Sequence, residues 1–261
     1  MKPIFYLLLI LLASNVSFAQ KTDTVYINPK NIKVDQLRDG KSTYLVYFRK
    51  QKDAIRTMTQ FWTREVKRKT ENGRKIIEVK QSWEDKDSIV HTATSILDAT
   101  TFKPLFHENW WNRNGKKSKS VYDYIKKQIN IDGIDTLNDN YAKSKEMSEK
   151  FLKATDTYHL NWHIDLEVFS ILPLSFHKTY AIPFYEAGYK EPENIYYTVT
   201  GEEKLKGYNS QEIACWILTH ETPGNKEKFW ISKKTKEVLK MEQEVNGKMY
   251  RHKIKLGFSV L

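Results

Sequence analysis

The feature that most constrains the fold is an Asn-Gly pair, Asn72-Gly73, which lies between two runs of alternating apolar and polar residues. Asn and Gly both tolerate positive φ, so the pair predicts a type I′ turn and a two-residue β-hairpin. A two-residue loop fixes the register, which places Trp62 opposite Trp83 and Val66 opposite Val79. The same register predicts two pairs of opposite charge on the other face, Glu65 with Lys80 and Lys67 with Glu78. A slip of one residue would separate all four pairs.

The same turn chemistry recurs along the chain and predicts further antiparallel hairpins. Asn114-Gly115 and Asn246-Gly247 each separate two strand-like runs, and Asp132-Gly133 predicts a further turn. The stretches before these two Asn-Gly pairs also match, because 97–105 aligns with 231–239 and shares a Thr and the final Leu. We interpret this similarity between the two segments as a shared hairpin architecture. Whether it also reflects an internal duplication is left open.

Other runs rich in aromatic and β-branched residues predict strands at 24–27, 43–49, 88–97, 102–111, 118–129, 178–185, 194–206 and 211–219. Residues 136–150 are polar and are expected to form a loop or a frayed helix. The stretch 158–172 fits both the alternation of a strand and the spacing of a helix. We predict a helix over 161–171 that stops before Pro173, partly because of the resemblance described below. No linker or low-complexity segment interrupts the chain, so 20–261 is expected to be a single β-rich domain.

The first nineteen residues have the pattern of a signal peptide, since Lys2 precedes an apolar run, 4–12, that is too short to span a bilayer of about 30 Å. Ser17 and Ala19 place small residues at −3 and −1, which predicts cleavage before Gln20. The alternative is an N-terminal membrane anchor. No cysteine follows the apolar run, which excludes a lipid-anchored lipoprotein. We expect a soluble mature chain that is periplasmic or secreted.

Charge and cysteine content limit the partners. Removing the signal peptide takes away Lys2 and no acidic residue, so the net charge of +11 becomes +10. A basic exported protein is expected to associate with anionic surfaces, glycans or lipids, and not with nucleic acid. The charges alternate in sign, however, as on a solvated sheet face.

Cys215 is the only cysteine, so an intrachain disulfide is excluded. Its apolar surroundings predict a buried, unreactive thiol.

The sequence contains little that points to catalysis. It has no G-x-S-x-G, P-loop or G-x-G-x-x-G motif. His107-Glu108 and Glu202-Glu203 are adjacent in sequence and would point to opposite faces of a strand. His159 and His163 have the i, i+4 spacing of metal ligands on a helix, but an exposed polar face explains them equally well. We therefore expect no catalytic residues, no metal and no cofactor.

Several segments together resemble an uncharacterised family of exported bacterial proteins of the Bacteroidetes type. They are Asn161–Glu167, Leu172–Leu174, Tyr196–Lys204, Cys215-Trp216 and Phe229–Glu242. The resemblance implies a curved half-barrel similar to those of lipoprotein carriers and related periplasmic lipid-binding proteins, and its motifs are structural, with no established catalytic residues to carry over. One departure is visible, because Ser175–Lys178 stands where the pattern leads us to expect a Gly.

The expected fold is mainly β: one strongly curved antiparallel sheet of about ten strands, with one main helix on its concave face. One helix cannot cover such a face completely, and uncovered apolar area costs about 25 cal/mol per Å². We therefore expect a non-enzymatic binding protein that holds an apolar or lipid-like ligand between sheet and helix, with the ligand lined by Trp162, Phe169, Trp216 and Trp230. The alternative is a structural, envelope-associated protein with a filled interior and no small-molecule ligand. An enzyme is the third class, and it would require a cleft with converging ionisable groups.

Overall fold

The computed structural model describes residues 23–136, 142–188, 191–207 and 210–259. The predicted signal peptide and its cleavage site lie outside these residues. Within them, no helix is long and apolar enough to cross a bilayer.

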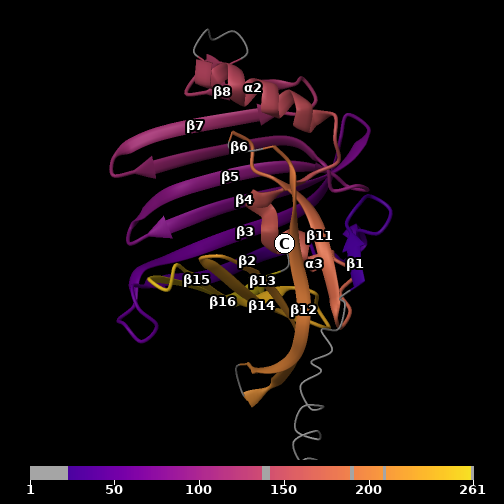
Figure 1. Cartoon of the computed structure of the whole chain (residues 1–261). Coiled ribbons are helices and arrows are strands. Elements are labelled where there is room, and N and C mark those ends of the chain that lie inside the picture. Colours follow the sequence, from indigo (N-terminus) through magenta and orange to yellow (C-terminus); the bar gives the residue numbers. More distant parts are fainter. Residues whose placement is uncertain (1–22, 137–141, 189–190, 208–209, 260–261) are drawn as a thin grey trace, which may run out of the picture.

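Most of the described chain forms one large sheet (Figure 1). The strands of the first half are β1 (Asp23–Tyr26), β2 (Gly40–Arg49), β3 (Thr57–Glu71), β4 (Arg74–Asp85), β5 (Ser88–Asp98), β6 (Pro104–Arg113), β7 (Lys116–Asp123), β8 (Gln128–Ile131) and β9 (Ile134–Asp135). Those of the second half are β10 (Leu160–Asn161), β11 (Lys178–Tyr185), β12 (Glu193–Lys206), β13 (Glu212–Thr222), β14 (Asn225–Ser232), β15 (Val238–Val245) and β16 (Met249–Ser259). The helical segments are η2 (Val34–Gln36), α2 (Ala142–Thr155), η3 (Trp162–Ile164) and α3 (Asp165–Ser170).

The order of strands across the sheet is β1-β11-β12-β13-β14-β15-β16-β2-β3-β4-β5-β6-β7-β8-β9, with β10 pairing β11 beside β1. The sheet does not close into a barrel, because β1 and β9 stand at opposite ends of this order. β16 pairs with β2 and so joins the end of the chain to its beginning. The described residues form sixteen strands, more than the about ten that the sequence predicted.

The hairpin predicted at Asn72-Gly73 is confirmed. Both residues have positive φ, 49° and 77°, and they connect β3 to β4. Trp62 pairs with Trp83 as expected, and the three other predicted pairs are found in the same register. The ion pairs that form are not the directly opposed ones, because Glu78 binds Lys69 at 2.7 Å and Lys80 at 3.3 Å.

The other predicted turns are also present. Asn114-Gly115 connects β6 to β7 and Asp132-Gly133 connects β8 to β9, each with two residues at positive φ. Asn246-Gly247 differs by one residue, since Val245 pairs with Met249 across a three-residue loop.

The two segments of similar sequence, 97–105 and 231–239, form the same connection in the structure. Between β5 and β6, the Phe102 amide donates to the Asp98 carbonyl and the Asp98 amide donates to the Lys103 carbonyl, at 2.9 and 3.0 Å. Between β14 and β15, the Lys236 amide donates to Ser232 and the Ser232 amide donates to Glu237, both at 2.9 Å. The shared hairpin architecture is therefore confirmed.

The predicted helix over 161–171 corresponds to η3 and α3, so it begins as a 3-10 turn and ends at Ser170. Asn161 caps it, because its side-chain oxygen accepts a hydrogen bond from the His163 amide at 2.9 Å. The expectation of one main helix was wrong. Residues 142–155 form the longer helix α2, which lies beside β7 and β8 (Figure 1). Its Phe151 and Ala154 belong to one hydrophobic cluster with Tyr122 of β7 and Ile129 of β8.

The sheet is also not wholly antiparallel. β1 and β10 both pair parallel with β11, whereas the other pairings are antiparallel. A parallel pair needs a long crossover, and here α3 lies in the connection from β10 to β11. Pro183, which has no amide hydrogen, lies between the part of β11 that pairs with β1 and the part that pairs with β10. Just before β11, His177 adopts a φ of 59° in the segment where the family pattern led us to expect a Gly.

The main hydrophobic cluster lies between α3 and the sheet. Phe169 of α3 is fully buried and contacts Phe184, Tyr197 and Phe229, with ring centroids 4.7–6.3 Å apart. A smaller cluster lies under α2, and a third lies on the opposite face of β13 and β14.

Candidate functional site

The four residues expected to line a lipid site are divided between two hydrophobic clusters. Trp162 and Trp216 pack at the border of the main cluster, and Phe169 lies inside it. Trp230 lies in the cluster on the opposite face of the sheet, with Cys215, because its neighbours on β14 point into the main cluster. The cavities described below are lined by other residues.

The two histidines with metal-ligand spacing lie in different environments. His159 precedes β10 and contacts the rings of Tyr124 and Tyr185. His163 lies in η3 and contacts His91. In the part of the chain that the structure describes, no three His, Cys, Asp or Glu side chains are grouped so that they could hold a metal ion.

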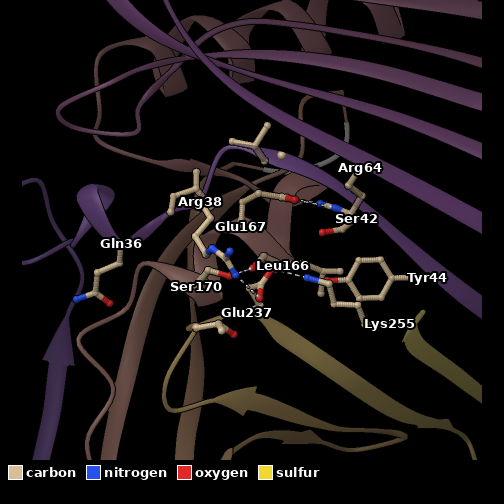
Figure 2. Close-up of a pocket in the computed structure, with 14 residues that line it drawn as sticks. Gln36, Arg38, Ser42, Tyr44, Arg64, Leu166, Glu167, Ser170, Glu237 and Lys255 are labelled. Carbon is tan, nitrogen blue, oxygen red and sulfur yellow. Dashed lines mark hydrogen bonds and ion pairs between the residues drawn. The ribbon is translucent and has the colours of Figure 1, made fainter. Parts of the chain in front are cut away.

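One small cavity, of about 30 Å³, lies beside α3, and its lining includes five charged side chains (Figure 2). Arg38 and Lys255 both bind Glu237, while Arg64 binds Glu167. A volume of about 30 Å³ has room for only one or two water molecules, since one water needs about 10–15 Å³. Each of the three cations contacts a carboxylate, so this cavity has the character of an ionic contact between α3 and the sheet.

The Arg64 guanidinium is the centre of that contact. Its Nε donates to Glu167 at 2.9 Å, Nη1 donates to Gln81 at 3.0 Å, and Nη2 donates to the His163 carbonyl at 3.2 Å. Asp165 lies 3.7 Å from Arg64 and 3.6 Å from Lys253. Burial would raise the pKa of Asp165, but the two cations hold it below its usual value. Burial lowers the pKa of Lys253 to about 8.

A larger cavity, of about 180 Å³, lies over β6 and β7. We call it the histidine cavity and define it by its lining residues, which are His107, Asn109, Trp111, Arg113, Ser118, Ser120, Tyr122, Asn161, His163, Glu186 and Ala187. Its floor consists of three cross-strand pairs on one face: His107 with Tyr122, Asn109 with Ser120, and Trp111 with Ser118. Segment 161–163 and the residues after β11 complete its wall.

A row of stacked rings runs across the sheet to this cavity. Trp62 stacks on Trp83 at 3.7 Å, Trp83 contacts His91 at 4.3 Å, and His91 stacks on Trp111 at 3.8 Å between ring centroids. Cations lie over the rings at both ends, with Lys253 4.9 Å from the Trp62 centroid and Arg113 4.1 Å from the Trp111 centroid. The row holds His91 and Trp111 in fixed orientations at the edge of the cavity.

Hydrogen bonds orient the polar groups around the cavity. His107 Nδ1 lies 2.9 Å from the Ser95 hydroxyl, which also accepts from the Asn161 amide at 3.3 Å. His91 Nε2 lies 2.9 Å from His163 Nε2. Burial lowers the pKa of both His91 and His107 to about 3, and burial together with His107 and Arg64 holds the pKa of His163 well below its usual value. All three imidazoles are therefore uncharged at neutral pH.

The chain is thus a mainly β protein with one open sheet and a polar, histidine-lined cavity beside it. It belongs to the DUF3108 family, described as proteins of unknown function, whose model matches residues 43–252. A search of the curated proteins found no match. Among solved structures, it is similar to a β-barrel-like protein of the domain of unknown function DUF1849 from Brucella abortus. The two are 9% identical with a TM-score of 0.46, over 86% of this chain and 98% of that chain.

Proposed function

We propose that this protein is an exported, non-enzymatic binding protein that holds a small polar ligand in the histidine cavity. The cavity of about 180 Å³ is the observation that carries the proposal. A concave site lined by a few converging polar groups, with imidazoles of strongly shifted pKa, is the usual form of a small-molecule site. The polar lining favours a compact polar ligand over the acyl chain that the sequence led us to expect.

The space between α3 and the sheet gives little support to a lipid site. Phe169, Phe184 and Phe229 are each at most 1% exposed and contact one another or their neighbours directly. An acyl chain bound there would have to displace buried rings, which cost about 3–5 kcal/mol when removed from a core. A lipid-like ligand therefore requires a rearrangement of this cluster, whereas a polar ligand in the histidine cavity does not.

We further propose that the sheet curves around α3 as a half-barrel similar to those of lipoprotein carriers. Side chains of α3 contact residues from strands that are far apart in the sheet order, including Arg64 on β3, Phe229 on β14 and Lys253 on β16. A flat sheet could not bring these strands to one short helix, and twisted sheets of many strands curl.

A second candidate is a structural role at the cell envelope without any small ligand. The filled interior around Phe169 and the compensated ionic contact around Arg64 favour it. The basic surface, with a net charge of +10 for the proposed mature chain from +11 less Lys2, would attract an anionic envelope surface. This candidate requires the histidine cavity to hold only water.

Native mass spectrometry of protein purified from its own envelope, with lipid extraction in parallel, tests the proposal. We expect a small polar adduct that is absent from Ser120→Phe, because a Phe at this position on the cavity floor would fill the cavity. Ser82→Phe is the matched control, since Ser82 points to the other face of β4 from Gln81 and Trp83. A lipid adduct that both variants retain would favour the lipid-like ligand. No adduct in any form of the protein would favour the structural role.

Export is tested separately. We propose cleavage of the signal peptide before Gln20, so N-terminal sequencing of the mature protein should begin at that residue. A mature chain that still begins at Met1 in the membrane fraction would indicate an anchor in place of a cleaved signal.

A further inference from the structure

The hydrogen bonds of His91 determine which nitrogen of His163 carries its proton. His91 Nδ1 lies 2.8 Å from the carbonyl oxygen of Trp110. A carbonyl only accepts, so His91 Nδ1 carries the hydrogen. A neutral imidazole has one N–H, which leaves His91 Nε2 as an acceptor. His163 Nε2, at 2.9 Å from it, must therefore be the donor.

The remaining nitrogen of His163 is consequently an unprotonated acceptor. Nε2 carries the one proton of the neutral ring, so Nδ1 holds a lone pair. Among the described residues, none forms a hydrogen bond with this Nδ1, and His163 is one of the residues that line the histidine cavity. The His163 backbone is fixed as well, because its carbonyl accepts from Arg64 at 3.2 Å and from Gln81 at 2.7 Å. The cavity thus contains one acceptor of fixed position and fixed tautomer.

The other lining groups have a different character. Ser118, Ser120, Asn109 and Asn161 carry hydroxyls and amides, which can both donate and accept. Such groups match ligand hydroxyls, which also donate and accept.

The two charged lining residues do not form a site for an ion. The Arg113 guanidinium lies over the Trp111 ring at 4.1 Å, and Glu186 lies on the exposed side of the wall. One cation and one carboxylate balance each other, so the lining carries no net charge to attract an ionic ligand. The arrangement favours a neutral ligand over a metal ion or a charged amine.

We propose that the histidine cavity binds a neutral, hydroxyl-rich ligand of about the size of one sugar ring, and that His163 Nδ1 accepts a hydrogen bond from one of its hydroxyls. The volume of about 180 Å³ is more than ten times the roughly 10–15 Å³ that one water molecule needs, so the cavity has room for a compact ligand. The inference rests on the proposed function, because it names the ligand class of the same cavity. It also makes His91 a positioning residue that holds His163 in the accepting tautomer without touching the ligand.

The tautomer is tested first, without any ligand. In ¹⁵N-edited NMR of the full chain at neutral pH, His163 should show a protonated Nε2 and an unprotonated Nδ1. His91 should show the opposite pattern. A protonated Nδ1 on His163 would overturn the inference and leave the proposed binding function standing.

Ligand class is tested next, with glucose and N-acetylglucosamine as probes and glycine and lysine as charged comparisons. We expect the sugars to bind and to shift the His163 Nδ1 resonance, and the amino acids to have no effect. His163→Gln should weaken sugar binding roughly tenfold, the value of a lost hydrogen bond, because its amide replaces Nε2 and leaves no acceptor at the Nδ1 position. His163→Asn places an amide near Nδ1 and should recover part of the affinity.

The outcomes separate the two claims. Binding of glycine or lysine but not of the sugars would overturn the ligand class while supporting a polar binding site. Binding of neither kind of probe, together with no adduct on the native protein, would overturn both proposals. Equal sugar affinity in His163→Gln and the unmodified chain, with both variants folded as judged by their Tm, would overturn the role of His163.

Discussion

The indole rings of Trp62 on β3 and Trp83 on β4 stack face to face, with centroids 3.7 Å apart and planes within 5° of parallel. This contact begins the row of rings that continues through His91 to Trp111 at the histidine cavity. Packing of this kind fixes the rotamers of large side chains at little cost in side-chain entropy. The row therefore links the hairpin at Asn72-Gly73 to the position of His91, and through His91 to the tautomer of His163.

Trp62→Ala should destabilise the protein by about 3–5 kcal/mol, because the ring is 3% exposed and its removal leaves a cavity beside Trp83. Urea unfolding followed by far-UV circular dichroism measures this loss. Trp110→Ala is the control, since Trp110 is partly exposed and points to the other face of β6 from Trp111, and it should cost less than about 2 kcal/mol. Equal losses in the two variants would mean that the stacked pair is not part of the core.

The buried pair of Arg64 and Glu167 gives a second prediction. Glu167→Ala should cost about 3–5 kcal/mol, because it leaves the guanidinium buried without its bidentate partner. The double variant Arg64→Leu with Glu167→Leu should be more stable than Glu167→Ala alone, since both charges are gone. The loss of unfolding free energy in the double variant is compared with the sum of the losses in Arg64→Leu and Glu167→Leu. Equal values would show that the two side chains do not act as a pair.

The hairpins could be predicted because their turns are encoded by two adjacent residues. Asn72-Gly73 and Asn114-Gly115 determine φ locally, and the loop length then sets which residues face each other. The floor of the histidine cavity followed from the same rule, since a two-residue loop at Asn114-Gly115 pairs His107 with Tyr122 and Asn109 with Ser120. The polar residues that alternate along both strands indicate that this face is polar.

Other features depended on contacts that no local pattern specifies. The partners of His163 come from β3, β4 and β5, and only the folded sheet brings them to segment 161–163. The parallel pairing of β1 with β11 likewise joins residues more than a hundred positions apart. Helix α2 was a different case, because Met147, Phe151 and Ala154 have helical spacing that the polar composition of the segment obscured.

The predicted lipid-site residues show the limit of counting aromatics without assigning faces. Phe229, Trp230 and Ile231 are consecutive on β14, so alternate residues must point to opposite sides. Phe229 and Ile231 enter the main cluster, and Trp230 enters the cluster on the other face. A face assignment along β14 would have separated Trp230 from the other three candidates.

Stability should fall as the pH drops below about 6.5, because of the buried histidines. Burial lowers the pKa of His107 to about 3 in the folded protein, whereas an unfolded chain has a His pKa of about 6.5. Between these values the unfolded state takes up a proton that the folded state does not, so acidification favours unfolding. His107 makes its full contribution to the free energy of unfolding above pH 6.5. About 2 kcal/mol of that contribution is lost by pH 5.

Comparison of the unmodified chain with His107→Gln isolates this contribution. Urea unfolding measures how far the free energy of unfolding falls from pH 7 to pH 5. This fall should be smaller in the variant by about 2 kcal/mol, even though the variant is less stable at pH 7. His220, which is partly exposed on β13, supplies the matched control His220→Gln, whose loss of unfolding free energy should equal that of the unmodified chain. Parallel losses in all three proteins would show that His107 is accessible to protons in the folded state.

The repeated connection before β6 and β15 gives the last prediction, because it places a non-glycine residue at positive φ in both copies. Lys236 has a φ of 64° and Phe102 a φ of 58°. A left-handed conformation costs an L-residue about 1–2 kcal/mol, which Gly does not pay. Phe102 is buried and its ring is needed for packing, but Lys236 is only partly buried.

Lys236→Gly should therefore leave the stability of the protein unchanged or raise it by up to about 1 kcal/mol. Lys234→Gly, in the same turn at ordinary φ, should destabilise by about 0.5–1 kcal/mol through added freedom of the unfolded chain. Chemical unfolding of both variants checks the difference in sign, and destabilisation of both to the same extent would mean that Lys236 carries no strain in this turn.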